Sequence, residues 1–261
     1  MKSDMSVQVF DFFRLKGQLP HSVFERFRRT VDEKSVLDRE AAELVAQEIK
    51  KWAEQNGVTH YAHWFQPLTG LTAGKQNTFF DRDEQGRVIS RFCGQDLIRG
   101  EPDASSFPHG GMRSTFEARG YTAWDPTSPV FIVQSEKSSV LYIPSVYFGY
   151  NGEVLDKKTP LLRSLKLING QSLMLLRSLG IRRRWVKNMI GPEQEFFLVP
   201  EDQYVQRPDL RTCGRVIFGA RPVRGQQMGD HYFGIIPDRV IAYLEDVEEA
   251  AKRLGIPIKT R

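Results

Sequence analysis

The spacing of apolar residues changes at about residue 155, and this change divides the sequence into two parts. Before it, short aromatic and β-branched runs with brief connections are typical of strands. Residues 58–71, 130–134 and 140–143 have this pattern, and residues 77–90 predict a hairpin that turns at 83–86. After the change, residues 156–180 predict one long core helix, with Thr159 as its cap and Pro160 suited to its first turn. Its apolar stripe comprises Leu161, Leu162, Leu165, Ile168, Leu173, Leu176 and Leu179. The sequence therefore predicts an α+β chain with domains 1–155 and 156–261.

Three further helices are predicted from periodicity and end signals. A short one covers residues 22–30, and a clearer one runs from Asp38, a good N-cap, to Asn56, followed by Gly57. The last covers residues 237–254, where one face is apolar and Gly255 closes the helix. Its apolar face comprises Val240, Ile241, Leu244, Val247, Ala251 and Leu254, and that of the second helix Ala42, Val45, Ile49 and Trp52.

The composition excludes several classes of protein. The 261 residues are 40% hydrophobic and 26% charged, which is ordinary for a globular protein, and no apolar run approaches a membrane span. Two cysteines are too few for a disulfide framework, so a reducing cytoplasm is the expected compartment. The net charge of +5 raises nucleic-acid binding as an alternative, but the basic residues are scattered among acidic ones. We therefore expect neither a nucleic-acid nor a membrane partner.

A metal site is the first candidate for chemistry, in the stretch GPEQEFFLV at Gly191–Val199. If the stretch is a strand, Glu193 and Glu195 point to one face, where their charges repel unless a cation lies between them. Hard divalent cations such as Mg²⁺ and Mn²⁺ prefer such oxygen ligands. The apolar residues that follow favour a strand buried on one side, and a solvated strand face with alternating acids is the alternative reading.

Two other stretches are candidates for chemistry. The loop EPDASSFPHGG at residues 101–111 either forms an Asx-type turn at Asp103 or presents that carboxylate on a rigid loop. His60 and His63 lie three residues apart in a predicted strand and so face opposite sides of it, which favours packing or hydrogen-bonding roles over a shared metal.

Seven motifs occur in an order that resembles glutamine synthetase of the long type III form. They are THYAHWFQPLTG, GEPDASSFP, TFEARGYTAWDP, LDKKTPLLRS, GPEQEFFLV, DHYFG and LGIPIKTR, and together they extend over nearly the whole chain. The resemblance implies a cytoplasmic ligase that joins glutamate and ammonium with ATP through a γ-glutamyl phosphate, using Mg²⁺ or Mn²⁺. It also implies a β-grasp-like N-terminal domain, the beginning of an antiparallel-sheet catalytic domain, and a homo-oligomer, a dodecamer of two hexameric rings.

The same resemblance implies roles for four residues. Glu193 and Glu195 match the metal ligands of the family, one for each of the two main metal sites. Asp103 matches the aspartate that reaches across a subunit interface and binds ammonium, although Ala104 replaces the glycine that follows it in shorter forms of the enzyme. Tyr232 matches a position beside the active-site funnel and is expected to contribute to cofactor binding.

The chain departs from the family in its length, because type III enzymes are far longer than 261 residues. The resemblance places further metal ligands, the nucleotide pocket and phosphate-binding arginines after LGIPIKTR. We therefore expect an N-terminal part of the enzyme that is inactive alone. A non-catalytic truncated subunit that docks with or regulates full-length enzyme is the alternative, and the coding sequence after Arg261 discriminates between the two. A ligase of the same superfamily that acts on another amine is less favoured.

Overall fold

The computed structural model describes most of the chain, which divides into two compact units. The units comprise residues 1–189 with 253–255 and residues 190–252 with 256–261. The described residues are 6–33, 36–68, 72–100, 120–194, 196, 198–219 and 235–260. No helix within these ranges is both long and apolar enough to cross a membrane. Compact units need not coincide with domains, so the boundary between residues 155 and 156 stays a prediction.

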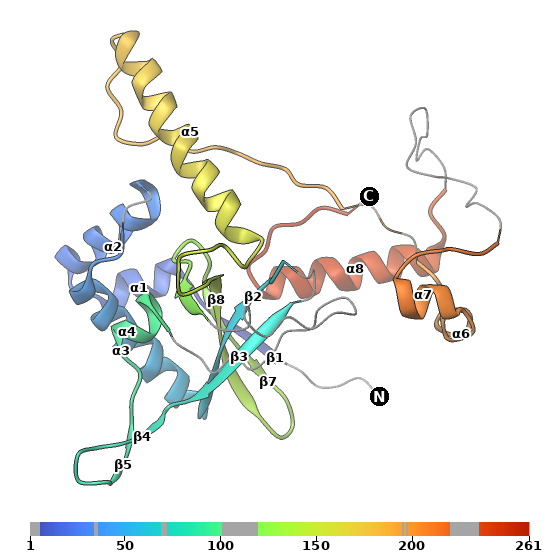
Figure 1. The fold of residues 1–261 in the computed structure, drawn as a ribbon, viewed down its shortest axis with the longest axis horizontal. Helices are drawn as coiled ribbons and strands as arrows, with labels where there is room; N and C mark the ends of the chain where they lie inside the picture. Colours follow the sequence, from blue (N-terminus) through green and yellow to red (C-terminus); the bar gives the residue numbers. More distant parts are fainter. Residues whose placement is uncertain are drawn as a thin grey trace. The chain divides into compact units, whose positions relative to one another are not determined.

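A six-stranded mixed sheet forms the centre of the first unit (Figure 1). The strand order is β1-β7-β8-β2-β3, and β6 pairs with the second half of β8. The pair β2–β8 is parallel, and all other pairs in this sheet are antiparallel. The strands are β1 Ser6–Phe10, β2 His60–Phe65, β3 Ala73–Thr78, β6 Tyr121–Trp124, β7 Val130–Gln134 and β8 Ser139–Phe148. Together with the helices described below, this sheet confirms the α+β prediction.

Four helices pack with this sheet, and their local signals explain where they form. They are α1 Phe12–Gln18, α2 His21–Glu33, α3 Arg39–Gln55 and α4 Gly94–Ile98. The Asp38 carboxylate caps α3 by accepting a 2.9 Å hydrogen bond from the Ala41 amide, and Gly57 follows the helix with a φ of 70°. The predicted apolar face of α3 is buried (Ala42, Val45, Ile49 and Trp52). The second predicted helix is thus confirmed from cap to cap, and α2 confirms the first.

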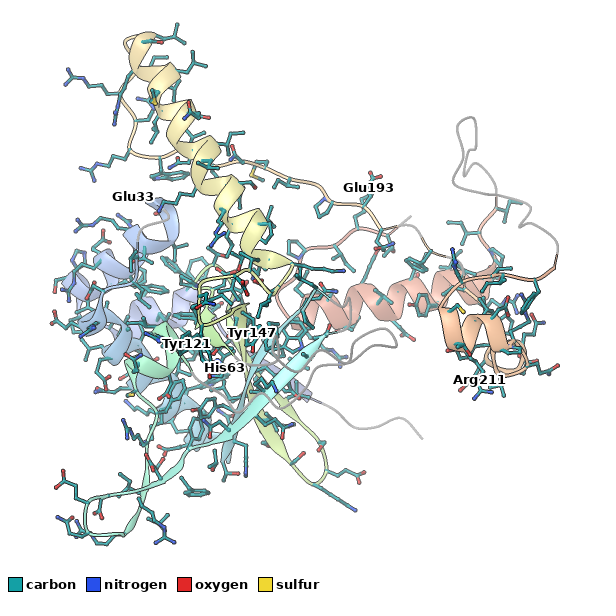
Figure 2. The ribbon with its side chains drawn as sticks, viewed as in Figure 1. Glu33, His63, Tyr121, Tyr147, Glu193 and Arg211 are labelled. Atoms are coloured by element: carbon teal, nitrogen blue, oxygen red, sulfur yellow. The ribbon has the colours of Figure 1, made fainter. Side chains whose placement is uncertain are left out.

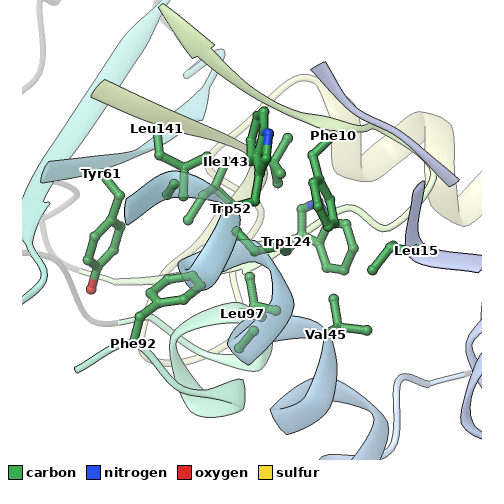
Figure 3. Close-up of a cluster of buried hydrophobic side chains, with 14 of the residues drawn as sticks. Phe10, Leu15, Val45, Trp52, Tyr61, Phe92, Leu97, Trp124, Leu141 and Ile143 are labelled. Atoms are coloured by element: carbon green, nitrogen blue, oxygen red, sulfur yellow. The ribbon is translucent and has the colours of Figure 1, made fainter. Parts of the chain in front are cut away.

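The hydrophobic core lies between these helices and one face of the sheet (Figure 3). Phe10 and Ile143 reach it from β1 and β8, Val45 and Trp52 from α3, and Leu97 from α4. Fully burying a side chain of this size stabilises a fold by about 1.5–3 kcal/mol, so the cluster is the main source of stability in this unit.

The predicted hairpin is also confirmed. Strands β4 Phe80–Arg82 and β5 Val88–Ser90 pair in antiparallel fashion. In the turn, the Asp83 carboxylate accepts hydrogen bonds from the amides of Gln85 and Arg87, and Gly86 takes a φ of 77° that suits glycine.

The long helix predicted after residue 155 exists as α5, Lys158–Ser178, but two details of the prediction are wrong. The N-cap residue is Lys157, not Thr159, and the Asp156 carboxylate just before it accepts hydrogen bonds of 2.9 Å from the amides of both Lys158 and Thr159. The helix is also not a core helix, since Asn169 is its only buried residue. One side is partly covered by the chain that follows, which is held there by a 2.7 Å hydrogen bond from the Val186 amide to Asn169 Oδ1.

The second unit contains α6 Glu201–Val205 and α7 Pro208–Cys213. The Asp209 carboxylate in α7 is buried, pairs with Arg207 and accepts a 2.8 Å hydrogen bond from the Ile217 amide. The guanidinium of Arg207 and the Ile217 amide hold the pKa of Asp209 far below its usual range. These contacts hold the chain at Ile217 against α7.

The last predicted helix is confirmed as α8, Asp238–Arg253. Its predicted apolar positions, Val240, Ile241, Leu244, Val247, Ala251 and Leu254, are each half-buried, whereas most of the other described positions around them are exposed. Gly255 ends the helix with a φ of 70°, as expected of a residue after a C-cap.

The prediction of a strand at Gly191–Val199 is wrong for the residues that the structure describes. Those residues lie in no helix or strand, and Phe196, Leu198 and Val199 are between 43% and 51% exposed. A strand forms through hydrogen bonds to a neighbouring strand. No described segment pairs with this stretch, so its apolar pattern alone does not make it a strand.

Candidate functional site

The structure describes one of the four predicted site residues. Glu193 is exposed (Figure 2). Asp103, Glu195 and Tyr232 lie outside the described residues. Within the described ranges, no group of three or more His, Cys, Asp or Glu side chains is placed to hold a metal ion. Because only Glu193 is among the described residues, the structure does not test whether the four lie together, and the roles of all four stay predictions.

The described residues on either side of Asp103 are fixed by hydrogen bonds. The amide of Gly100 donates to the carbonyl of Thr122 at 2.9 Å, and the amide of Thr122 donates to the carbonyl of Gly100 at 2.9 Å. The Thr122 hydroxyl also contacts the Gly100 carbonyl at 3.3 Å. We call Gly100, Gly120 and Thr122 the loop stem, since residues 101–119 run from Gly100 to Gly120.

Both glycines of the loop stem sit where a side chain has no room. A Cβ on Gly100 would lie 2.5 Å from Thr122 Oγ1 and 2.8 Å from His63 Nε2. A Cβ on Gly120 would lie 2.3 Å from the Phe148 carbonyl oxygen. Glycine at these positions allows the backbone to approach β2 and β8 closely, which fixes where the segment carrying Asp103 leaves and rejoins the sheet.

His63 lies beside the loop stem and is 2% exposed. Its Nδ1 lies 3.3 Å from Ser145 Oγ, and the Ser145 hydroxyl in turn donates to the Ile143 carbonyl at 2.9 Å. Because that hydroxyl proton is already engaged, we assign the Nδ1 proton to His63 as the donor. Burial lowers the pKa of His63 to about 4, so the ring is neutral at pH 7.

This geometry confirms the packing and hydrogen-bonding role predicted for His63. His60 is exposed, with its Nδ1 2.7 Å from Thr59 Oγ1, so the two histidines face opposite sides of β2 as expected. A neutral, buried imidazole held in this way supports the loop stem and does not meet solvent.

A partly buried ion pair links the end of β6 to the start of α5. Asp125 is 2% exposed and pairs with Lys158, whose Nζ also donates to Ser128 Oγ at 2.7 Å. The Asp125 carboxylate accepts two more hydrogen bonds from Thr127, at 3.0 Å from its amide and 2.7 Å from its hydroxyl. Burial alone would raise the pKa of Asp125, but the charge of Lys158 and these hydrogen bonds outweigh burial and lower it.

Sequence reasoning missed this ion pair and the Asp156 hydrogen bonds beside it. The signal for these hydrogen bonds was present in LDKKTP, where an aspartate precedes a proline-containing helix start by a few residues. The partner of Asp125 lies more than thirty residues further along the chain, and no local pattern indicates it.

The family model and the relatives that match this chain are all glutamine synthetases. The sequence family described as glutamine synthetase type III N terminal matches residues 1–164. The type-3 glutamine synthetase of Dictyostelium discoideum is 44% identical over 269 aligned positions, which cover 100% of this chain and 36% of that protein. A glutamine synthetase of Bacteroides fragilis (strain YCH46) is 45% identical over 253 positions, which cover 97% of this chain and 34% of that protein. One from Butyrivibrio fibrisolvens is 30% identical over 97% of this chain and 36% of its own length. The chain thus spans 34–36% of the length of these relatives.

Proposed function

Since the chain belongs to the type III glutamine synthetase family, we propose that it is the N-terminal part of an enzyme that joins ammonia to glutamate with ATP. The observation that carries the proposal is the distribution of identity. The alignments cover 97–100% of this chain with 44–45% identical residues, but they cover only 34–36% of the length of each relative. The remaining part of the active site then comes from polypeptide beyond the matched part, and the 261 residues alone are expected to be inactive.

In the proposed reaction, Glu193 and Glu195 each hold one divalent metal ion, Mg²⁺ or Mn²⁺. The donor chemistry fits, because carboxylate oxygens suit these hard cations and Glu193 is exposed without an ion-pair partner among the described residues. When bound, the metal ions neutralise charge on the transferred phosphoryl group. Each carboxylate fills only part of the six-ligand sphere of its own cation, so these two residues alone are expected to bind the cations weakly.

Asp103 is proposed to bind ammonium and to accept its proton as ammonia attacks the γ-glutamyl phosphate. A carboxylate suits both steps, since it stabilises the cation and then acts as the base. The loop stem supports this role, because the Gly100–Thr122 hydrogen bonds fix both ends of the segment that carries Asp103. Tyr232 is proposed to line the cofactor-binding side of the same site.

The proposal extends to architecture. We propose that the six-stranded sheet and its helices form the β-grasp-like domain of residues 1–155, and that residues 156–261 begin the antiparallel catalytic domain. The parallel pair β2–β8 within an otherwise antiparallel sheet, with α3 packed against the shared core, supports the first assignment. We also propose a cytoplasmic homo-oligomer, a dodecamer of two hexameric rings, in which Asp103 serves a neighbouring subunit.

The test is a chimera in which this chain replaces the matched N-terminal part of the Bacteroides fragilis relative. The chimera is expected to form glutamine from glutamate, ammonium and ATP, whereas the 261-residue chain alone is not. Asp103→Asn is expected to lower kcat by about 10²–10⁴-fold, the usual contribution of general acid–base catalysis.

Glu193→Gln is expected to raise the Mg²⁺ concentration needed for half-maximal activity, because it removes one anionic ligand. Glu201→Gln, an exposed acid in α6, is the matched control and is expected to change neither quantity. Full activity of the Asp103→Asn chimera, or glutamine formation by the chain alone, would refute the proposal.

The alternative is a non-catalytic subunit that docks with full-length enzyme, and the limited coverage of the relatives is also compatible with it. Assembling the full-length relative in the presence of excess chain discriminates between the two. A regulatory subunit would change the activity in proportion to the chain incorporated, whereas an N-terminal enzyme part is expected to leave it unchanged.

A further inference from the structure

One side of α5 is apolar, uncharged and exposed. Six large side chains are between 46% and 68% exposed there: Leu161, Leu167, Ile168, Met174, Leu175 and Leu179. A helix that faces water normally places charged residues on its outer side. This exposed side is therefore unusual for a helix in its final environment.

The positions of these residues form one face. At about 100° per residue, the six side chains and the small or neutral residues Ser164, Gln171 and Ser178 fall within an arc of about 140°. The charged residues of the helix interior, Arg163, Lys166 and Arg177, fall outside this arc. The series 161, 164, 168, 171, 175 and 178 alternates steps of three and four, which is the spacing of a seam between packed helices. We call these nine residues the α5 docking face.

A different side of α5 is already covered by its own chain. Asn169 accepts the hydrogen bond from Val186, and Leu165 lines one hollow together with Trp185 and Val186. Figure 1 shows the chain after α5 returning alongside the helix. The docking face lies outside this contact, so the return of the chain does not account for it.

We propose that the α5 docking face packs against a helix supplied by the polypeptide that extends the relatives beyond the matched part. This source of the helix rests on the proposed function, since it assumes that the chain is the N-terminal part of that enzyme. The length outside the match is sufficient, because the chain covers only 34–36% of each relative.

Charge disfavours a second copy of α5 as the occupant and sets the chemistry of the partner. Residues 157–187 contain nine basic residues and no acidic one, so two copies of this segment would repel each other. The nine are Lys157, Lys158, Arg163, Lys166, Arg177, Arg182, Arg183, Arg184 and Lys187. The partner helix is accordingly amphipathic, with a matching apolar seam and carboxylates on the border nearest Arg163.

Cysteine accessibility tests this without relying on activity. In a background with Cys93→Ser and Cys213→Ser, single cysteines are placed on the docking face (Ile168→Cys or Leu175→Cys) or on the charged side (Lys166→Cys). Maleimide labelling is compared between the 261-residue chain and the chimera with the Bacteroides fragilis relative. We expect Ile168→Cys and Leu175→Cys to label at least about tenfold more slowly in the chimera, and Lys166→Cys to label equally in both.

A second measurement guards against misfolded variants. Ile168→Gln with Leu175→Gln is expected to leave the Tm of the chain unchanged and to lower the Tm of the chimera, whereas Arg163→Gln with Lys166→Gln has the smaller effect there. Equal labelling of the docking face in chain and chimera would overturn the inference. Protection that appears in the chain alone as its concentration rises would assign the face to a second copy and also overturn it. An inactive chimera with a protected face would refute the proposed function and leave this inference standing.

Discussion

Acidification is predicted to destabilise the first unit through His63. The ring is 2% exposed and packs against Ser145, the edge of Tyr61 and the loop stem, with Asp96 as the acidic group that acts on it. Burial lowers the pKa of His63 in the folded protein from 6.5 to about 4, and the attraction of Asp96 offsets only part of this effect. The folded state therefore resists protonation that the unfolded chain accepts.

The sign and size of the change in the free energy of unfolding follow from proton linkage. Between pH 6.5 and about pH 4 the unfolded chain carries a proton on His63 and the folded chain does not, so the free energy of unfolding decreases as the pH falls. Each unit of pKa difference corresponds to about 1.4 kcal/mol, which gives a loss of about 3 kcal/mol across this window. Above pH 6.5 the contribution of His63 is constant, and the low pKa of Asp125 places its own contribution below this window.

Urea unfolding at a series of pH values between 7.5 and 4.5 measures the effect. The wild-type free energy of unfolding is expected to fall by close to 1.4 kcal/mol per pH unit more steeply than that of His63→Gln in the lower half of this range. His60→Gln, which changes an exposed histidine of the same strand, is the matched control and is expected to keep the wild-type slope. Equal slopes for wild type and His63→Gln would refute the reasoning, whatever the absolute stability of the variant.

Further substitutions test three other sites by their effect on stability. Lys158→Met leaves the buried Asp125 carboxylate without its cation and is expected to cost about 3–5 kcal/mol in urea unfolding, part of which Asp125→Asn restores in the double variant. Gly120→Ala places a Cβ against the Phe148 carbonyl and is expected to lower the free energy of unfolding by about 1–3 kcal/mol. In Gly170→Ala the new Cβ meets nothing within 4 Å, and the variant is expected to stabilise α5 by up to about 1 kcal/mol. A lower thermal midpoint for both variants would contradict this pairing. Ile49→Ala empties a fully buried position in α3 and is expected to cost about 2–5 kcal/mol, with an unchanged urea midpoint as the contrary result.

The elements that the sequence predicted best are those whose signals lie within a single element. Asp38, the apolar spacing of α3 and Gly57 fall within some twenty residues, and together they locate both ends of that helix. The hairpin β4–β5 and α8 with Gly255 were predictable for the same reason. Local hydrogen bonds and one-sided burial decide these elements, and both leave a pattern in adjacent residues.

Contacts between distant residues left no such pattern. Strand β1 was not predicted, because its place in the sheet depends on the pairing of Ser6 with Gln134 and Phe10 with Val130. The Asp125–Lys158 ion pair and the approach of Gly100 to His63 likewise join residues far apart in sequence. The tertiary fold selects these partners from many residues of the same type.

The two largest errors, a core position for α5 and a strand at Gly191–Val199, have one physical explanation. An apolar stripe on a helix and an apolar run in a strand record which side is buried in the assembled protein. In the described residues four members of the predicted α5 stripe are half-buried, while Leu161, Ile168 and Leu179 remain substantially exposed, as do Phe196, Leu198 and Val199. If the proposed function is correct, both surfaces are buried by the part of the enzyme beyond the match. The same packing would then convert Gly191–Val199 into a strand and align Glu193 with Glu195. Protection of the α5 docking face and tight metal binding by this pair are therefore expected to appear together.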